Sequence, residues 1–300
     1  MRYQLKTSII AVANQKGGVG KTATSVNLAA SFAHLGRKTL LLDLDYQANA
    51  TSNFGLKQKA KAAGKTASIA LREGKNLSAA AVQTEDKNLD LVAGDMGLSK
   101  LSREKILDPG AAMLLRHWLD STEAREYDVI VIDTHPSLDL LFQMAMTAAH
   151  YYLVPMFAEA DPFDGLQYMF EEINQIKQGL NPNLFFLGIA VTKFDKTNST
   201  HRKFYELLEE FGIENKIGIR GTIPDSKAIA ASSNAQRPLL WQQSHSTLPI
   251  TKAYVELAKA LWPDLKGARQ GRKQNTPNIE STPKKIAEIF SDELNVEVDL

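Results

Sequence analysis

The stretch that decides the fold is Lys16-Gly17-Gly18-Val19-Gly20-Lys21-Thr22, which follows an apolar run at residues 8–13 and opens a helical pattern. The glycines let the backbone wrap so that consecutive N–H groups point at one centre, and the amino end of the helix adds partial positive charge. We expect Lys21 to reach the β- and γ-phosphates of a nucleotide and the Thr22 hydroxyl to bind Mg²⁺. A plain strand-to-helix turn is the alternative, but the Lys-Thr ending favours a triphosphate cradle. The predicted contacts come from Gly17, Gly18, Val19, Gly20, Lys21, Thr22 and Ala23.

Carboxylates stand at the ends of two apolar runs. Asp133 ends the run at residues 129–132, and Asp43 and Asp45 end the run at residues 39–42. At the carboxyl edge of an open α/β sheet such acids lie where ligands bind, so they are candidates for the metal shell and for orienting water. The alternative is that they only form turns. We predict Thr22, Asp43 and Asp133 as the metal site.

Short apolar runs alternate with longer helical patterns through the first 260 residues. This alternation is typical of an α/β fold, a doubly wound, mostly parallel sheet with helices on both faces. A first helix is predicted at residues 22–35, capped by Gly36, and a last one at residues 247–261, closed by Trp262-Pro263. Strands are predicted at residues 8–13, 39–43, 89–93, 129–133, 151–155, 185–192 and 217–222.

The composition narrows the classes of function. The 300 residues carry 35 Lys and Arg against 34 Asp and Glu, a net charge of +1, so any charged partner must meet a local patch. The absence of cysteine excludes disulfides, thiolate nucleophiles and Cys-bound metal clusters. No apolar run approaches the roughly 18 residues of a spanning helix. We expect a cytoplasmic protein.

Three motifs together resemble a known family. They are residues 14–22, then Asp43-Leu44-Asp45 with Gln47 and residues 49–51, then residues 127–133. Over residues 8–262 the chain resembles the deviant Walker A ATPases of the ParA/MinD group, and most of all the ParA/Soj partition ATPases. The resemblance implies a P-loop NTPase fold, ATP and Mg²⁺ as cofactors, and ATP hydrolysis.

The resemblance also implies roles for particular residues. Lys16 resembles the signature lysine that reaches the partner's phosphates across a nucleotide-sandwich dimer, so Lys16, Lys21 and Asp45 are the predicted catalytic residues. Asp45 resembles the residue that positions the hydrolytic water, and Asp43 an acid of the magnesium network. The implied function is segregation of plasmid or chromosomal DNA by an ATP-dependent homodimer. That dimer binds DNA non-specifically, associates with the nucleoid and has a ParB-like partner that stimulates hydrolysis.

The sequence leaves open whether the base-binding residues bind ATP or GTP. Thr192-Lys193-Phe194-Asp195 looks like the guanine-reading motif of some GTPases, whereas the resembled group binds ATP and carries variants at this place. The segment at residues 221–225 resembles the family's loop that packs on adenine. Thr192, Pro224 and Asp225 are therefore the predicted base contacts.

The chain departs from the family pattern near the catalytic acids. Tyr46 stands where the family usually has proline, and Thr134-His135-Pro136 replaces the usual Cys-Pro-Pro turn. We do not interpret His135 as a general base, because the family's water is positioned by a carboxylate and a histidine here is more often a hydrogen-bonding turn residue.

The candidate DNA contacts match the family only in part. Asp225 follows the Ile-Pro pair where arginine is frequent, and an ordinary solvated face is the alternative. A second candidate is the basic run at residues 266–273. The main candidates are Lys193, Lys196, Arg202, Lys203, Lys216, Arg220, Lys227 and Arg237.

The composition changes near residue 264. We predict an ATPase domain at residues 1–263 and a charged, flexible tail at residues 264–300. Ile286, Ile289 and Phe290 have helical spacing after two lysines, which faintly resembles the membrane helix of MinD-like ATPases, but the acidic residues that follow make membrane binding the weaker alternative. A positioning ATPase for a protein cargo is the other alternative.

Overall fold

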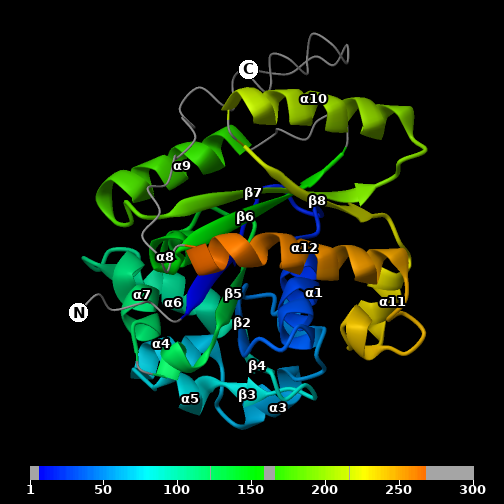
Figure 1. The fold of residues 1–300 in the computed structure, drawn as a ribbon. Coiled ribbons are helices and arrows are strands. Elements are labelled where there is room, and N and C mark those ends of the chain that lie inside the picture. The colour runs from blue at the N-terminus through cyan, green and yellow to red at the C-terminus, as the bar shows by residue number, and fades with distance from the viewer. Residues whose placement is uncertain (1–6, 122, 159–165, 216, 268–300) are drawn as a thin grey trace.

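The computed structural model describes residues 7–121, 123–158, 166–215 and 217–267, which form one sheet covered by helices (Figure 1). The eight strands lie in the order β3-β4-β2-β5-β1-β6-β7-β8. Every pairing is parallel except that of β3 with β4. The predicted doubly wound, mostly parallel sheet is therefore confirmed.

The bounds of the elements follow. The strands are β1 Ser8–Val12, β2 Thr39–Leu44, β3 Val82–Gln83, β4 Leu89–Val92, β5 Val129–Thr134, β6 Tyr151–Phe157, β7 Phe185–Phe194 and β8 Ile219–Pro224. The α-helices are α1 Lys21–His34, α2 Asn49–Ser52, α3 Lys57–Ala62, α4 Ala67–Glu73, α5 Leu77–Ala80, α6 Gly97–Lys105, α7 Leu114–Leu119, α8 Leu140–Ala148, α9 Leu166–Gly179, α10 Ser199–Asn215, α11 Ala228–Asn234 and α12 Pro249–Gly267. Short 3₁₀ helices are η1 Ala111–Met113, η2 Glu123–Glu126 and η3 Leu239–Trp241.

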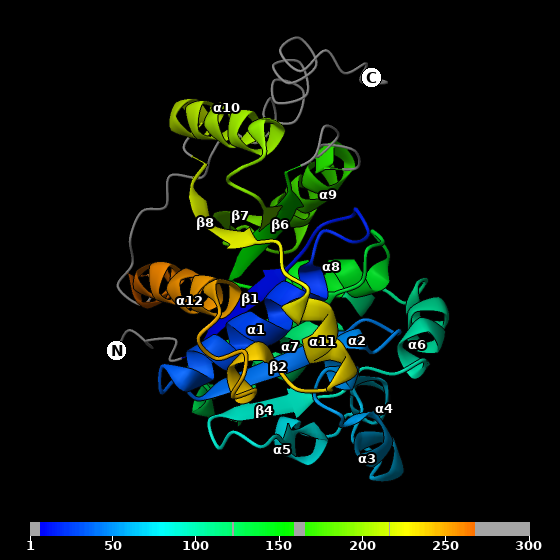
Figure 2. The ribbon, with the colours of Figure 1, turned by 90° about the vertical axis from the view of Figure 1, so that its right-hand side faces the viewer.

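The sheet separates two apolar cores, one under each layer of helices. Side chains of successive strand residues point to opposite faces, so in β1 Ile9 and Ala11 join one core while Ile10 and Val12 join the other. Helices α1 and α12 pack against each other over one face, whereas α4 and α6 to α10 contribute to the core of the other (Figures 1 and 2). Because both faces are buried, the central strands read as continuous apolar runs.

The strands predicted from the sequence are all present, several with shifted ends. β6 and β7 each run two residues further than predicted, to Phe157 and Phe194, and β8 spans Ile219–Pro224 rather than residues 217–222. The predicted adenine loop at residues 221–225 is therefore mostly strand, and only Asp225 follows it. The two-residue edge strand β3 was not predicted.

The sequence predicts that the last helix ends at Trp262-Pro263. This prediction is wrong, because α12 continues through Pro263 to Gly267. Proline removes one helical hydrogen bond, but tertiary contacts hold the last turn. Leu265 is fully buried, its carbonyl oxygen accepts a hydrogen bond from Ser8 Oγ at 3.1 Å, and Arg220 forms an ion pair with Asp264 at 2.8 Å. Helix α12 thus extends beyond residue 263, and Ile286, Ile289 and Phe290 lie outside the described residues. No helix in the described ranges is long and apolar enough to cross a membrane.

Candidate active site

The predicted phosphate loop connects β1 to α1 in the middle of the sheet. Gly18 and Gly20 have φ angles of 76° and 84°, the left-handed conformation that favours glycine. Asn14 holds the start of the loop, since its Nδ2 donates to the Pro155 carbonyl oxygen at 2.8 Å and its Oδ1 accepts from the Lys16 N–H at 2.9 Å. The loop is therefore anchored to β6 and opens directly into the positive end of α1.

Lys21 is a buried cation in the first turn of α1. Its side chain donates from Nζ to the Lys16 carbonyl oxygen at 2.8 Å. Burial lowers the pKa of Lys21 to about 8, against the opposing charges of Asp133 and Asp45. An anionic phosphate beside the ammonium would favour its charged form, so this lysine suits the role predicted for it.

Two predicted acids, Asp43 and Asp133, stand opposite each other on the neighbouring strands β2 and β5. Both are fully buried. Burial and the charge of Asp43 raise the pKa of Asp133 to about 8, while the hydroxyls of Ser25 and Thr22 lower it. Ser25 Oγ donates to Asp133 Oδ1 at 2.7 Å, but Asp133 Oδ2 has no hydrogen-bond partner among the described residues.

The unpaired Asp133 Oδ2 bears on whether the residues present fit a Mg²⁺ ion. In the described part of the chain no group of three or more His, Asp or Glu side chains could hold a metal alone. Mg²⁺ is commonly bound by one or two carboxylates together with substrate phosphates and water. Asp133 Oδ2, close to the first turn of α1 with Thr22, offers such a partial donor set, so the residues present fit magnesium bound with a nucleotide.

Asp43 is held by Thr51 and Asp45, both in the motif quoted above, and through Thr51 by Gly94, which the sequence reasoning did not single out. Thr51 donates to Asp43 Oδ2 from its N–H at 2.7 Å and from Oγ1 at 2.6 Å, and the Asp45 N–H donates to Oδ1 at 3.2 Å. The Thr51 hydroxyl also accepts from the Gly94 N–H at 2.9 Å. Burial nevertheless raises the pKa of Asp43 to about 6. Both Asp43 oxygens therefore accept hydrogen bonds from the protein, whereas Asp133 Oδ2 accepts none from the described residues.

Asp45 follows β2 at the same edge of the sheet. Its Oδ1 accepts from the Gln47 N–H at 2.8 Å and lies 3.8 Å from His135 Nε2. The His135 ring stacks on Tyr46, with ring centroids 4.1 Å apart and an interplanar angle of 26°. The two departures from the family pattern therefore contact each other beside the predicted water-positioning acid.

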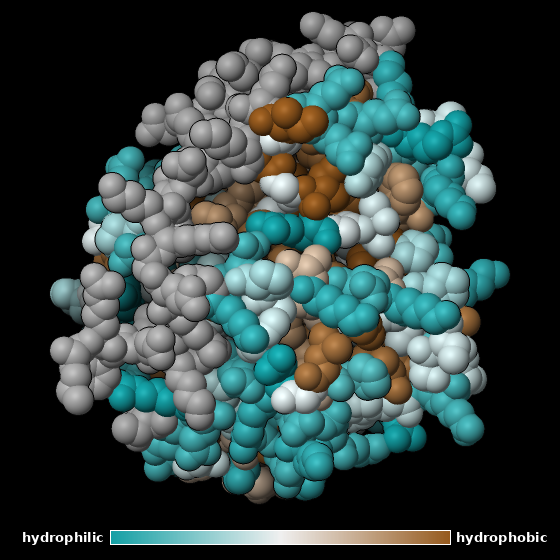
Figure 3. Space-filling view, in the orientation of Figure 1, coloured by the Kyte–Doolittle hydropathy of each residue, from teal (hydrophilic) through white to brown (hydrophobic). Residues whose placement is uncertain are grey.

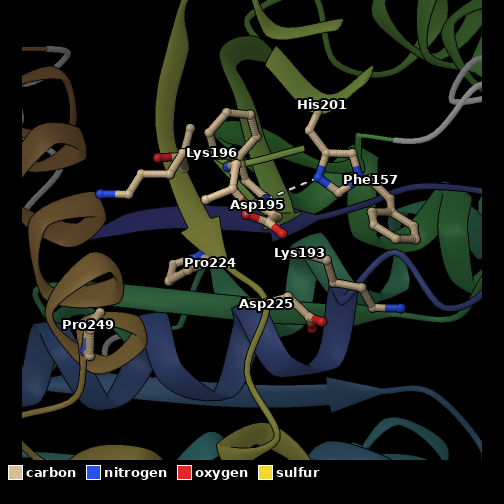
Figure 4. A pocket seen from close by; sticks show the side chains of 11 residues that line it. Phe157, Lys193, Asp195, Lys196, His201, Pro224, Asp225 and Pro249 are labelled. Atoms are coloured by element: carbon tan, nitrogen blue, oxygen red, sulfur yellow. Dashed lines mark hydrogen bonds between the residues drawn. The ribbon is translucent and has the colours of Figure 1, made fainter. Parts of the chain in front are cut away.

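A cavity of about 710 Å³ lies at the carboxyl ends of β6, β7 and β8 (Figure 4). Pro224 and Asp225 line it, as predicted for base contacts, together with Phe157, Lys193, Phe194, Asp195, Lys196, Thr197, His201, Thr222 and Pro249. Thr192 is not among the lining residues. Its hydroxyl instead donates to the Val19 carbonyl oxygen at 2.9 Å, so it joins the phosphate loop to the end of β7 beside the cavity.

The guanine-like motif has its acid already engaged. Asp195 Oδ1 accepts from the N–H and the hydroxyl of Thr197 at 2.8 and 2.7 Å, and the Asp195 N–H donates to His201 Nδ1 at 3.0 Å. These bonds fold the segment after β7 on itself, and they hold the pKa of Asp195 below its usual value. The cavity can receive a base. The carboxylate oxygen Oδ1 of Asp195, however, already accepts hydrogen bonds from its own turn.

The predicted DNA contacts do not form one patch. Arg220 pairs with Asp264, and Arg237 pairs with Glu85, so these two cations serve ion pairs within the fold. The face that carries α10 and α12 is largely hydrophilic, with apolar atoms in separate groups (Figure 3). Lys216 lies outside the described residues, and exposed Lys227 precedes α11. Four exposed cations gather where β7 leads into α10, and we call Lys193, Lys196, Arg202 and Lys203 the β7–α10 cluster.

The fold and site define a P-loop nucleotide-binding protein: a glycine-turned loop at a helix amino end, a lysine in the first turn, and buried acids on the adjacent strands. A family model described as an AAA domain matches residues 7–186. The chain is 40% identical over 202 residues to the chromosome partitioning protein ParA of Myxococcus xanthus, which covers 66% of this chain and 70% of that one. It is 35% identical over 253 residues to ParA of Caulobacter vibrioides, which covers 84% and 92% of the two chains.

Two solved structures extend the likeness to the whole fold. A plasmid partition protein of Borrelia burgdorferi bound to AMPPNP has a TM-score of 0.71 at 27% identity, covering 86% of this chain and all of that one. A Mycobacterium smegmatis protein described as cobyrinic acid a,c-diamide synthase, with a bound ATP analogue and magnesium, has a TM-score of 0.72 at 28% identity, covering 90% and 99%. The chain belongs to the ParA/MinD-type ATPases.

Proposed function

We propose that this chain is a partition ATPase that dimerises around two ATP molecules, binds DNA non-specifically as the dimer, and lets go after a ParB-like partner stimulates hydrolysis. ATP and Mg²⁺ are its cofactors. The observation that carries the proposal is the phosphate loop that begins with Lys16 and ends in Lys21, whose ammonium interacts with the charges of Asp133 and Asp45. The ParA relatives support the cargo class, DNA, and nucleoid association follows from DNA binding.

The residues divide the work of hydrolysis as follows. Lys21 and the N–H groups of the loop neutralise the phosphates, and Lys16 adds a cation from the partner protomer. Thr22 and Asp133 would hold Mg²⁺, which supplies charge neutralisation at the β- and γ-phosphate oxygens. Asp45 orients the attacking water, and Asp43 adds negative charge beside the metal. Most of the rate enhancement in this class comes from positioning and electrostatics rather than covalent chemistry.

The first experiment tests the different roles proposed for Lys21 and Lys16. Lys21→Ala should lose nucleotide binding. Lys16→Ala should keep nucleotide binding but remain a monomer with a non-hydrolysable ATP analogue. A fluorescent ATP analogue measures nucleotide binding, and light scattering and ultracentrifugation measure the oligomeric state, each with the wild-type chain as the reference. A wild-type chain that binds the analogue and keeps the same monomeric mass would refute the proposed switch.

Asp45 is tested separately from binding. Asp45→Ala should retain ATP-dependent dimerisation and DNA retention while hydrolysis stalls, because only the alignment of water is lost. Normal turnover in this variant would remove the water-positioning role.

DNA binding is tested on the β7–α10 cluster. Phosphate contacts release counterions, so binding should require ATP, tolerate any duplex sequence and weaken steeply with salt. Alanine at Arg202 and Lys203, which do not line the cavity beside Pro224 and Asp225, should weaken retention, whereas Arg237→Ala, which only breaks the pair with Glu85, should not. If the ATP-loaded protein shows no retention at low salt, flotation with liposomes and capture of a protein cargo become the alternatives to examine.

The preference between ATP and GTP is measured on the same protein. The bound ATP analogues of the related structures support ATP in the cavity beside Pro224 and Asp225. Tighter binding of GTP than ATP would overturn this choice.

A further inference from the structure

His135 and Tyr46 form a pair that the family pattern does not carry. Tyr46 follows Asp45 just beyond the end of β2. His135 comes directly after β5, the strand that neighbours β2. Leu44 and Thr134 are opposite each other in the parallel register, so the next residues along the two strands, Asp45 and His135, leave the sheet side by side. The two non-family residues are thus brought to the predicted catalytic acid by the sheet itself.

The contact between the ring and the acid is sheltered. His135 Nε2 lies 3.8 Å from Asp45 Oδ1, and the two side chains are only 12% and 6% exposed. A polar contact with little access to water is stronger than the same contact on an open surface. A ring nitrogen at this place can therefore influence the direction in which the Asp45 carboxylate points.

The ring is held in place by stacking. Its Nδ1 is buried and has no hydrogen-bond partner among the described residues, so no bond at that atom fixes the ring. The parallel contact with Tyr46, at 4.1 Å between centroids, does fix it. Aromatic pairs of this kind stabilise a structure beyond the effect of their buried area, which favours one orientation of the His135 ring.

We propose that His135 is a positioning residue for Asp45 and that Tyr46 is the platform that holds it. The imidazole Nε2 restrains the direction of the Asp45 carboxylate, and the Tyr46 ring keeps the imidazole from turning away. The inference rests on the proposed role of Asp45 as the water-positioning acid. His135 acts through Asp45 and does not itself take the proton of the attacking water.

Four single variants separate the parts of the pair. His135→Ala and Tyr46→Ala should each lower kcat for ATP about tenfold to a hundredfold, the range for groups that orient a catalytic side chain. The KM for ATP and the affinity for a fluorescent ATP analogue should stay within about twofold, because neither residue is placed on the nucleotide. Tyr46→Phe keeps the ring and should keep kcat. His135→Phe keeps the stack but lacks Nε2, and should be as slow as His135→Ala.

Two results would overturn the inference. One is a wild-type kcat in His135→Phe, since the ring nitrogen would then be unnecessary. The other is a loss in Tyr46→Phe equal to that in Tyr46→Ala, since the hydroxyl rather than the stack would then matter. Thermal unfolding and ATP-dependent dimerisation of each variant show whether the fold is intact. If the alanine variants unfold, the two phenylalanine variants still decide.

The double variant His135→Ala with Asp45→Ala distinguishes two failures. One is failure of the positioning role of His135, and the other is failure of the proposed role of Asp45. If Asp45 positions water and His135 acts through it, adding His135→Ala to Asp45→Ala should lower kcat no further. A further fall by the factor seen in the single variant would overturn the inference while leaving the role of Asp45 standing. Normal turnover of Asp45→Ala alone would instead overturn the proposed role of Asp45.

Discussion

Replacing Thr51 with valine tests how the buried acid Asp43 is held. The Thr51 hydroxyl donates to Asp43 Oδ2 at 2.6 Å and accepts from the Gly94 N–H at 2.9 Å, and Thr51 is fully buried. Valine has nearly the same shape but makes neither bond. A lost hydrogen bond to a charged group and a buried N–H left without a partner together cost about 3 kcal/mol of the free energy of unfolding.

Thr51→Ser is the matched control, because it keeps the hydroxyl and removes one methyl group. It should cost about 1 kcal/mol. Valine should therefore be the more destabilising substitution although it is closer to threonine in size. Urea unfolding of the nucleotide-free protein measures both, and a serine variant less stable than the valine variant would refute the reasoning from hydrogen bonds.

The cost of Thr51→Val should also depend on pH. The folded pKa of Asp43, about 6, lies above its ordinary value of 3.8, so ionisation of Asp43 opposes folding as the pH rises through this range. The Thr51 hydroxyl limits that penalty by favouring the charged form. Without it the folded pKa rises further, so the destabilisation should be larger at pH 7.5 than at pH 5. An equal cost at both pH values would show that the charge of Asp43 is not involved.

Three further changes have defined outcomes. Gly94→Ala would place a Cβ 2.7 Å from the Asp45 carbonyl oxygen and 2.8 Å from Asp43 Cγ, so it should lower the unfolding free energy by about 1–3 kcal/mol and slow hydrolysis, as calorimetry and a phosphate-release assay would show. Asp139→Ala removes the cap that accepts from two N–H groups at the start of α8, and should cost about 1 kcal/mol in urea unfolding with unchanged ATPase activity. Burial raises the pKa of Asp133 to about 8, so its ionisation should destabilise the nucleotide-free protein as the pH rises from about 4 to 8. Asp133→Asn should remove that part of the pH dependence of the unfolding free energy. An unchanged pH dependence in the variant would contradict the raised pKa of Asp133.

Features that depend on local pattern were predictable from the sequence. The central strands appear as uninterrupted apolar runs because helices cover both faces, and the phosphate loop has a spacing of glycines and lysine that few other structures need. The strand-end positions of Asp43, Asp45 and Asp133 followed from the same reasoning. Their roles in hydrolysis stay predictions.

Features that depend on contacts between distant segments were not predictable. Gly94 meets Asp43 and Thr51 only because β2 and β4 are neighbours in the sheet, although β3 and several short helices separate Asp43 from Gly94 along the chain. The continuation of α12 through Pro263 depends on the burial of Leu265, which outweighs the local preference of proline. The pairing of Arg220 with Asp264 likewise removes a cation from the predicted DNA surface.

The direct opposition of Asp43 and Asp133 on β2 and β5 has a consequence for engineering this protein. The spacing of their backbones is set by the ladder of hydrogen bonds between β2 and β5, although Thr51 and Gly94 in the connecting segments hold the Asp43 side chain. Surface segments far from Thr51 and Gly94 can therefore be exchanged between relatives without moving the two acids. A graft of that kind should alter what the protein recognises long before it alters how fast nucleotide is consumed.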